Sequence, residues 1–184
     1  MRDVGELAIQ AFPLPSPNQK KTYPLNLAMA ESITLTPNLT RAERYQELLP
    51  QIKAVVEAES DPIANMANAA AMLKEAFDFF WVGFYRMQEG ELVLGPFQGP
   101  LACTRIPLSK GVCGASASQQ KTLIVADVNA FPGHIACSSL SKSEIVVPKV
   151  VEGKTTLILD VDSDEYDDFS EVDQKYLEEM MTYF

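Results

Sequence analysis

The sequence predicts an α+β domain: one antiparallel sheet with helices packed on one face. Two observations lead to this class. Two helical segments with clear start signals come first, and a series of short aromatic and β-branched segments follows them. A further capped helical segment then closes the chain. The order helix, helix, several strands, helix is typical of a single sheet with its helices gathered on one side.

The two leading helices are predicted from their capping residues. Thr40 and Glu43 have the spacing of a capping box, and apolar residues recur after them at helical spacing. Pro50 should kink or divide this first helix. Asp61 and Pro62 are the N-cap and first-turn signals of a second helix, which is rich in alanine.

Strands are predicted where β-branched and aromatic residues cluster between turn signals. The first two form a hairpin around "QEGE", and the last two are joined by "EGK". The small-residue segment "GVCGASASQQ" is expected to be a short helix. Ser170 and Asp173 predict the cap of the closing helix. The strand segments are, in chain order, "FFWVGFYRM", "LVLG", "LACTRIPL", "TLIVAD", "SEIVVPKVV" and "TTLILDVD".

The 184 residues are predicted to form one domain, residues 40–184, preceded by a proline-rich arm. Residues 1–39 contain five prolines that interrupt any periodic pattern, so we expect an extended or flexible arm. A domain of this size can bury enough surface to fold without disulfides or a metal.

Charge and hydropathy exclude several classes of function. The net charge of −10 argues against binding to a nucleic-acid backbone, which needs clustered Lys and Arg. No apolar run approaches the length of a membrane span, and no secretion signal is recognisable at the N-terminus. We therefore expect a cytoplasmic protein with its three cysteines as thiols, and no partner among membranes or nucleic acids.

The three cysteines lie close together in the sequence, near the single histidine, His134. Three interpretations stay open: buried structural cysteines, a zinc site of three sulfurs and one nitrogen, or thiol redox chemistry. Cys137 lies in a serine-rich loop where its sulfur could meet a substrate. Cys113 lies at a predicted helix start, where the helix dipole favours a thiolate, and Cys103 is expected in a strand.

His134 precedes Cys137 by three residues and could favour the thiolate of that cysteine. The alternative is a loop histidine with no chemical role. We count it only as a supporting residue.

Three acidic residues form a second candidate cluster. Asp160 and Asp162 are two apart on a strand, so their side chains share one face, and Glu144 begins the preceding strand. Carboxyl groups held close together raise one another's pKa, which keeps at least one of them protonated at neutral pH. The alternative is a solvated strand end leading into an acidic loop. That loop lacks the pattern of an EF-hand calcium site.

Trp81, Gly83 and Tyr85 alternate along the first strand and should share one face. A glycine between two aromatic residues predicts a gap with flat walls, which suits a methyl group or a cation. The alternative is a pair of core aromatics with the glycine at a bulge.

Together these segments resemble the free methionine-(R)-sulfoxide reductases, which are built on the GAF fold. The resemblance covers residues 41–184 and implies a six-stranded antiparallel sheet with helices on one face and a pocket closed by loops. It is carried by "WVGFY", "LVLGPFQG", "LACTRIPLSKGVCG", "DVNAFPGHIACSSLSKSEIVVP" and "LDVDS".

The resemblance implies a role for each cysteine. Cys137 in "GHIAC" matches the nucleophile. Cys103 and Cys113 match the two positions associated with resolution, and we prefer Cys103 as the direct partner.

The resemblance also implies a substrate pocket. Glu144, Asp160 and Asp162 match its acidic side, which serves both catalysis and binding. Trp81 and Tyr85 match its aromatic wall.

The function implied is reduction of free methionine-(R)-sulfoxide through a cysteine sulfenic acid and a disulfide, with thioredoxin as the external reductant and no bound cofactor or metal. Such a protein would act against oxidative stress, and a homodimer through the first helices is a further expectation. The alternatives are a GAF sensor domain that binds a small ligand without turnover, and a zinc-stabilised structural module.

Overall fold

The centre of the molecule is a six-stranded antiparallel sheet with the strand order β3-β2-β1-β6-β5-β4. The computed structural model describes residues 32–133 and 138–184. The predicted strands are confirmed, although β3 and β4 are shorter than expected. The strands are β1 (Trp81–Gln88), β2 (Glu91–Gln98), β3 (Arg105–Pro107), β4 (Leu123–Val125), β5 (Ser143–Val151) and β6 (Lys154–Ser163).

The helices begin where their capping residues predict. Thr40 and Glu43 form the capping box of the first helix, and Asp61 accepts hydrogen bonds from the first turn of the second. The first helix runs through Pro50 without being divided, because Pro50 lies on an exposed side where water can bind the carbonyl group left unpaired. Within the described ranges, no helix is long and apolar enough to cross a membrane. The helices are α1 (Arg41–Ala58), α2 (Pro62–Phe77), α3 (Gly111–Gln119), the 3-10 turn η1 (Val128–Ala130) and α4 (Glu171–Met181).

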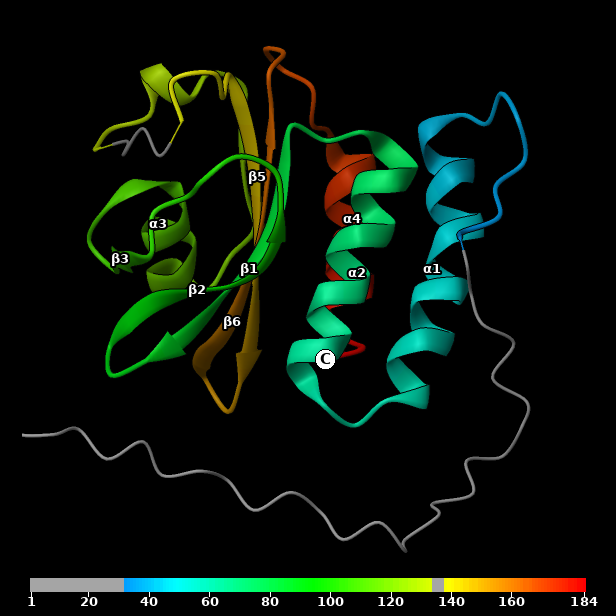
Figure 1. Ribbon diagram of the computed structural model, residues 1–184. Helices are drawn as coiled ribbons and strands as arrows, with labels where there is room; N and C mark the ends of the chain where they lie inside the picture. Colours follow the sequence, from blue (N-terminus) through cyan, green and yellow to red (C-terminus); the bar gives the residue numbers. More distant parts are fainter. Residues whose placement is uncertain (1–31, 134–137) are drawn as a thin grey trace, which may run out of the picture. The chain divides into compact units, whose positions relative to one another are not determined.

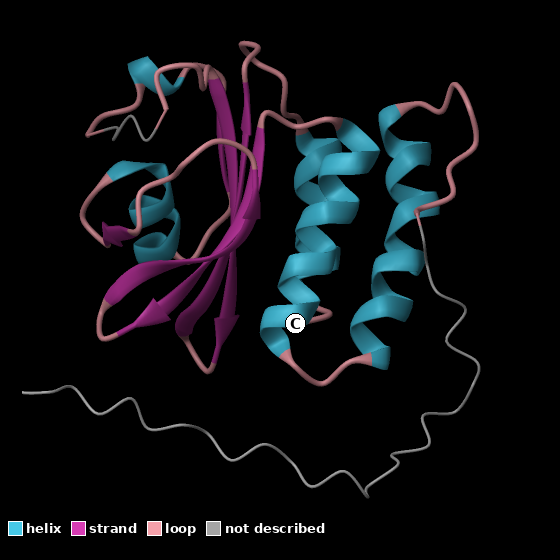
Figure 2. Cartoon of the chain, in the orientation of Figure 1, coloured by secondary structure: helices cyan, strands magenta, loops and turns pink. Residues whose placement is uncertain are grey.

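The sheet separates two layers of unequal size (Figure 1, Figure 2). Helices α2 and α4 lie against one face, and α1 packs over them. The prediction of helices on one face is confirmed for these three. The nine-residue α3 differs and lies on the opposite face, where Val112 and Ala117 join an apolar cluster with side chains of β1, β5 and β6.

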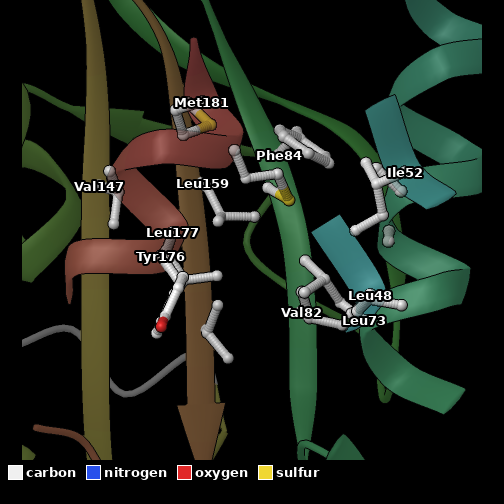
Figure 3. Close-up of a cluster of buried hydrophobic side chains, with 14 of the residues drawn as sticks. Leu48, Ile52, Leu73, Val82, Phe84, Val147, Leu159, Tyr176, Leu177 and Met181 are labelled. Atoms are coloured by element: carbon white, nitrogen blue, oxygen red, sulfur yellow. The ribbon is translucent and has the colours of Figure 1, made fainter. Parts of the chain in front are cut away.

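Alternation along the strands assigns each side chain to one of these layers. Val82 and Phe84 on β1 and Leu159 on β6 point toward the helices and join a large apolar core (Figure 3). Their sequence neighbours face the other side, where a second apolar cluster includes Trp81 and Tyr85. The β6 residues that alternate with this core therefore open onto the α3 side.

Part of the predicted arm is ordered against α1. The backbone N–H and the hydroxyl of Thr36 both donate to the carboxylate of Glu47, each over 2.8 Å. Residues 32–39 thus follow α1 closely, whereas residues 1–31 lie outside the described residues. The arm's predicted extended or flexible character stays a prediction for that part.

A buried carboxylate ties α1 to α4. Asp173 is fully buried in the first turn of α4 and accepts hydrogen bonds from the Arg41 guanidinium and, over 2.9 Å, from the Tyr45 hydroxyl. It also accepts the N–H of Ser170, as the predicted capping box requires. The Arg41 guanidinium lies over three aromatic rings, those of Phe77, Phe79 and Phe169, at 5.6 to 5.9 Å.

We expect Asp173→Asn to lower the free energy of unfolding by on the order of 3 kcal/mol, because it leaves the partly buried Arg41 charge without its counter-ion. Urea unfolding followed by circular dichroism measures this loss. Glu171→Gln is the matched control, since this side chain is exposed on the same helical turn and its change should stay within about 0.5 kcal/mol. Equal losses in the two variants would contradict a special role for the buried carboxylate.

Candidate active site

A pocket lies on the α3 side of the sheet. Its floor comes from β1, β5 and β6, and α3 and two loops form its walls. Six residues singled out from the sequence line it: Trp81, Tyr85, Cys113, Glu144, Asp160 and Asp162.

The strand register brings the three acidic side chains together. Glu144 on β5 lies directly opposite Asp162 on β6, and Asp160 follows two residues earlier on the same face. On the other side of β6, Trp81 pairs with Asp162 and Gly83 with Asp160. The sequence predicted this proximity, and the antiparallel ladder supplies the contact between strands that spacing alone could not.

Burial and mutual repulsion make these carboxyl groups weak acids. Glu144 and Asp160 are each only 6% exposed. Burial, with repulsion from Asp160 and Asp162, raises the pKa of Glu144 well above its usual value. Burial raises the pKa of Asp160 to about 6, and burial together with Asp160 raises the pKa of Asp162. The cluster therefore holds protons near neutral pH.

Cys113 lies beside the acids in the first turn of α3. Its thiol donates a hydrogen bond to the Glu144 carboxylate with an Sγ–Oε1 distance of 3.8 Å. Burial, with the charges of Asp160 and Glu144, raises the pKa of the Cys113 thiol well above its usual value. The expectation that the helix start favours a Cys113 thiolate is therefore wrong, because burial and neighbouring negative charge outweigh the dipole.

The aromatic wall is held in place by stacking and by hydrogen bonds to the backbone. The Trp81 ring stacks on those of Tyr85 and Phe97, with centroid distances of 6.0 and 5.4 Å. Its indole N–H donates to the carbonyl of Pro100 over 3.1 Å. Trp81 and Tyr85 thus line the pocket in fixed positions.

The space above Gly83 is filled, which corrects the predicted gap. A Cβ atom at Gly83 would lie 2.5 Å from the Trp81 ring and 2.4 Å from Cβ of Phe97, and one at Gly99 would lie 2.5 Å from the same indole. Gly83 also borders a register shift between β1 and β2. The two glycines let the indole lie close to the backbone, as in the alternative of core aromatics with a glycine at a bulge.

Cys103 lies two residues before β3 begins, so its predicted place within a strand is wrong. Its backbone carbonyl accepts a hydrogen bond from the Tyr85 hydroxyl over 3.1 Å. This bond connects the backbone at Cys103 to a side chain of β1. Ala102, its chain neighbour, lines the pocket.

Cys137 and His134 lie outside the described residues, so their predicted places beside the acids stay predictions. Ser138, which follows Cys137 in the chain, lines the pocket. So does Ser141, whose side chain partly opposes the rise in the pKa of Asp162. Ser141 belongs to the serine-rich loop after Cys137, and no local pattern in the sequence indicates that it would lie beside an acid of β6.

Comparisons with known proteins agree with this architecture. The model of the GAF domain family matches residues 63–184. The chain is 55% identical over 154 residues to "GAF domain-containing protein A" of Dictyostelium discoideum, covering 83% of this chain and 97% of that protein. It is 40% identical over 160 residues to the free methionine-R-sulfoxide reductase of Saccharomyces cerevisiae, covering 82% of this chain and 89% of that protein.

A solved structure resembles this one in both fold and sequence. The X-ray structure of free methionine-R-sulfoxide reductase from Neisseria meningitidis, in complex with its substrate, superposes with a TM-score of 0.80 at 51% identity. The match covers 83% of this chain and 92% of that one. The chain therefore belongs to the GAF domain family and, within it, to the free methionine-R-sulfoxide reductases.

Proposed function

We propose that this protein reduces free L-methionine-(R)-sulfoxide to methionine through cysteine redox chemistry. One observation carries the proposal: buried carboxyl groups and aromatic rings share a pocket with Ala102 and Ser138, the chain neighbours of Cys103 and Cys137. Relatives that are named free methionine-R-sulfoxide reductases support the same activity, including its preference for the R epimer.

The first step needs a nucleophilic sulfur and an acid. In our proposal the Cys137 thiolate attacks the sulfoxide sulfur while a protonated carboxyl group donates to its oxygen. The sulfur–oxygen bond of the substrate breaks, methionine leaves, and the oxygen remains on Cys137 as a sulfenic acid. Cys113 suits the nucleophilic role poorly, because its raised pKa keeps the thiol protonated.

The acidic cluster can serve both as proton donor and as binding site. Glu144, Asp160 and Asp162 titrate as a coupled set, so one member can hold a proton while another carries charge. A charged member attracts the ammonium group of the free amino acid, and the faces of Trp81 and Tyr85 add cation–π attraction. A peptide-bound residue lacks that ammonium group.

A second thiol completes the cycle. Cys103 condenses with the sulfenic acid, which forms a disulfide and releases the oxygen as water. Thioredoxin then reduces this disulfide by thiol exchange, and no bound cofactor is needed. Thioredoxin as reductant, action in the cytoplasm and a homodimer remain predictions.

We expect Cys137→Ser to lower consumption of free methionine-(R)-sulfoxide with dithiothreitol by roughly 10³-fold or more, because the attacking sulfur is lost. Chromatographic quantification of methionine measures the rate. Cys103→Ser is the matched control: with one equivalent of reduced protein it should still release one methionine per chain. Ligand binding by the wild type without turnover would favour the sensor alternative, and an equivalent of firmly bound structural zinc would favour the zinc module.

The wild-type protein should prefer the R epimer of the free amino acid to the S epimer and to the same residue within a peptide. The preference for the free amino acid has a physical reason: the acidic cluster can pair with the substrate's ammonium group, which a residue within a peptide lacks. A chiral assay of both epimers, free and peptide-bound, measures the preference. Equal rates on free and peptide-bound substrate would contradict recognition by the acidic cluster.

Stability should fall as the pH rises from about 4 to 7, because the folded protein holds protons on the acidic cluster that the unfolded chain has already released. For Asp160 the pKa is raised to about 6, against about 3.9 in an unfolded chain, so it destabilises the fold as it ionises. Asp160→Asn should therefore become stabilising relative to wild type as pH rises, by up to about 3 kcal/mol at neutral pH.

Urea unfolding of the reduced proteins at several pH values measures this difference. Asp164→Asn is the control, since this aspartate is exposed just beyond β6. A constant difference between Asp160→Asn and wild type across the range would show that Asp160 does not titrate in the way described.

A further inference from the structure

Three possible metal ligands converge in the floor of the pocket. The sulfur of Cys113 and one carboxylate oxygen each from Glu144 and Asp160 all lie within 4.8 Å of one another, and all three residues are buried. They come from three different elements, α3, β5 and β6. The tertiary fold therefore assembles this group, which no sequence spacing reveals.

A second observation concerns the carboxylate of Asp160 at the same place. Oδ1 of Asp160 is buried and has no hydrogen-bond partner within the described part of the chain. Buried carboxylate oxygens are normally satisfied by a donor, a cation or water. A buried carboxylate oxygen of this kind, on one of three converging ligands, is compatible with a cation that replaces the protons held by Cys113 and Glu144.

The geometry is close to that of a tetrahedral zinc site. With bonds of about 2.3 Å to sulfur and about 2.1 Å to oxygen, ligand atoms around Zn²⁺ lie roughly 3.5 Å apart. The Cys113 Sγ and Glu144 Oε1 atoms are already 3.8 Å apart. Side-chain shifts on the order of 1 Å would bring the remaining ligand–ligand distances to this value. The fourth coordination position of the ion would stay open.

The ligand chemistry selects the ion. One thiolate with two carboxylates suits a borderline-soft divalent ion, whereas Mg²⁺ and Ca²⁺ prefer oxygen ligands alone and more of them. A divalent ion also compensates the negative charge that the three ligands carry once deprotonated, and a coordinating thiol loses its proton on binding.

We propose that the reduced protein binds one Zn²⁺ ion through Cys113, Glu144 and Asp160. From the sequence we expected no bound metal, and the zinc alternative used three cysteines and His134. The proposed ligand set differs from that alternative in two of its three members. This proposal does not depend on the proposed reductase activity. The three ligands and the buried Oδ1 atom of Asp160 are present whether or not the protein reduces methionine sulfoxide.

Occupancy by zinc would change what the pocket can bind. The ion would engage the carboxylate oxygens of Glu144 and Asp160 and offset most of the negative charge of the deprotonated ligands. A cationic ligand would then find these oxygens occupied and less negative charge to pair with, so zinc would act as a reversible competitor in the reduced state.

The test is a titration of the full reduced chain with Co²⁺ and Zn²⁺, using a phosphine reductant because dithiothreitol itself chelates zinc. Bound Co²⁺ should show a thiolate-to-metal charge-transfer absorption that one equivalent of Zn²⁺ abolishes and excess Mg²⁺ leaves unchanged. Cys113→Ser should lose this absorption. Cys103→Ser should keep it.

Asp160→Asn tests the orphan oxygen and should weaken the affinity for Zn²⁺ by at least about tenfold, since loss of even an outer-shell partner costs that much. Asp164→Asn should bind as wild type does, and thermal unfolding checks that each variant is folded. Absence of the charge-transfer absorption in wild type, or its persistence in Cys113→Ser, would overturn the proposal. Turnover of methionine sulfoxide is measured separately, so the two proposals can fail independently.

Discussion

The ladder between β5 and β6 is the constraint on which the pocket depends. Antiparallel pairing places Glu144 directly opposite Asp162, an arrangement that like charges disfavour. The strands cannot relieve this repulsion by slipping one residue, because a slip would turn Leu159 and Val161 away from the apolar core. Hydrophobic burial on one face of the sheet therefore holds the acids together on the other.

The sheet also separates stability from chemistry. The helical side holds the larger apolar core and the Arg41–Asp173 connection between α1 and α4. The α3 side holds the titrating carboxyl groups and the buried thiol. Burial of apolar side chains on the helical side stabilises the fold by about 1.5–3 kcal/mol for each large side chain. This free energy can offset the cost of burying acidic groups on the α3 side.

Local signals in the sequence were enough for much of the fold. The caps at Thr40, Asp61 and Ser170 depend on bonds within one turn, and the common face of Asp160 and Asp162 follows from strand geometry. The side of the sheet covered by α3 could not be predicted, because a short segment of small residues has no strong apolar face of its own.

Features that involve distant residues escaped prediction for the same reason. The pKa of Cys113 depends on acids from β5 and β6, and the place of the Trp81 ring depends on Phe97 across the hairpin. Family resemblance supplied roles for these positions but not their surroundings. The orphan oxygen of Asp160 is likewise visible only in three dimensions.

The indole of Trp81 lies over backbone where Gly83 and Gly99 present no side chains. A smaller side chain at position 81 would leave a cavity bordered by the backbone of Gly83 and Gly99. Neither glycine has a side chain that could fill this space. One substitution could thus enlarge the cavity beside β1 while leaving the acidic residues of its floor in place. Position 81 is therefore the place at which the pocket can be enlarged for a bulkier ligand.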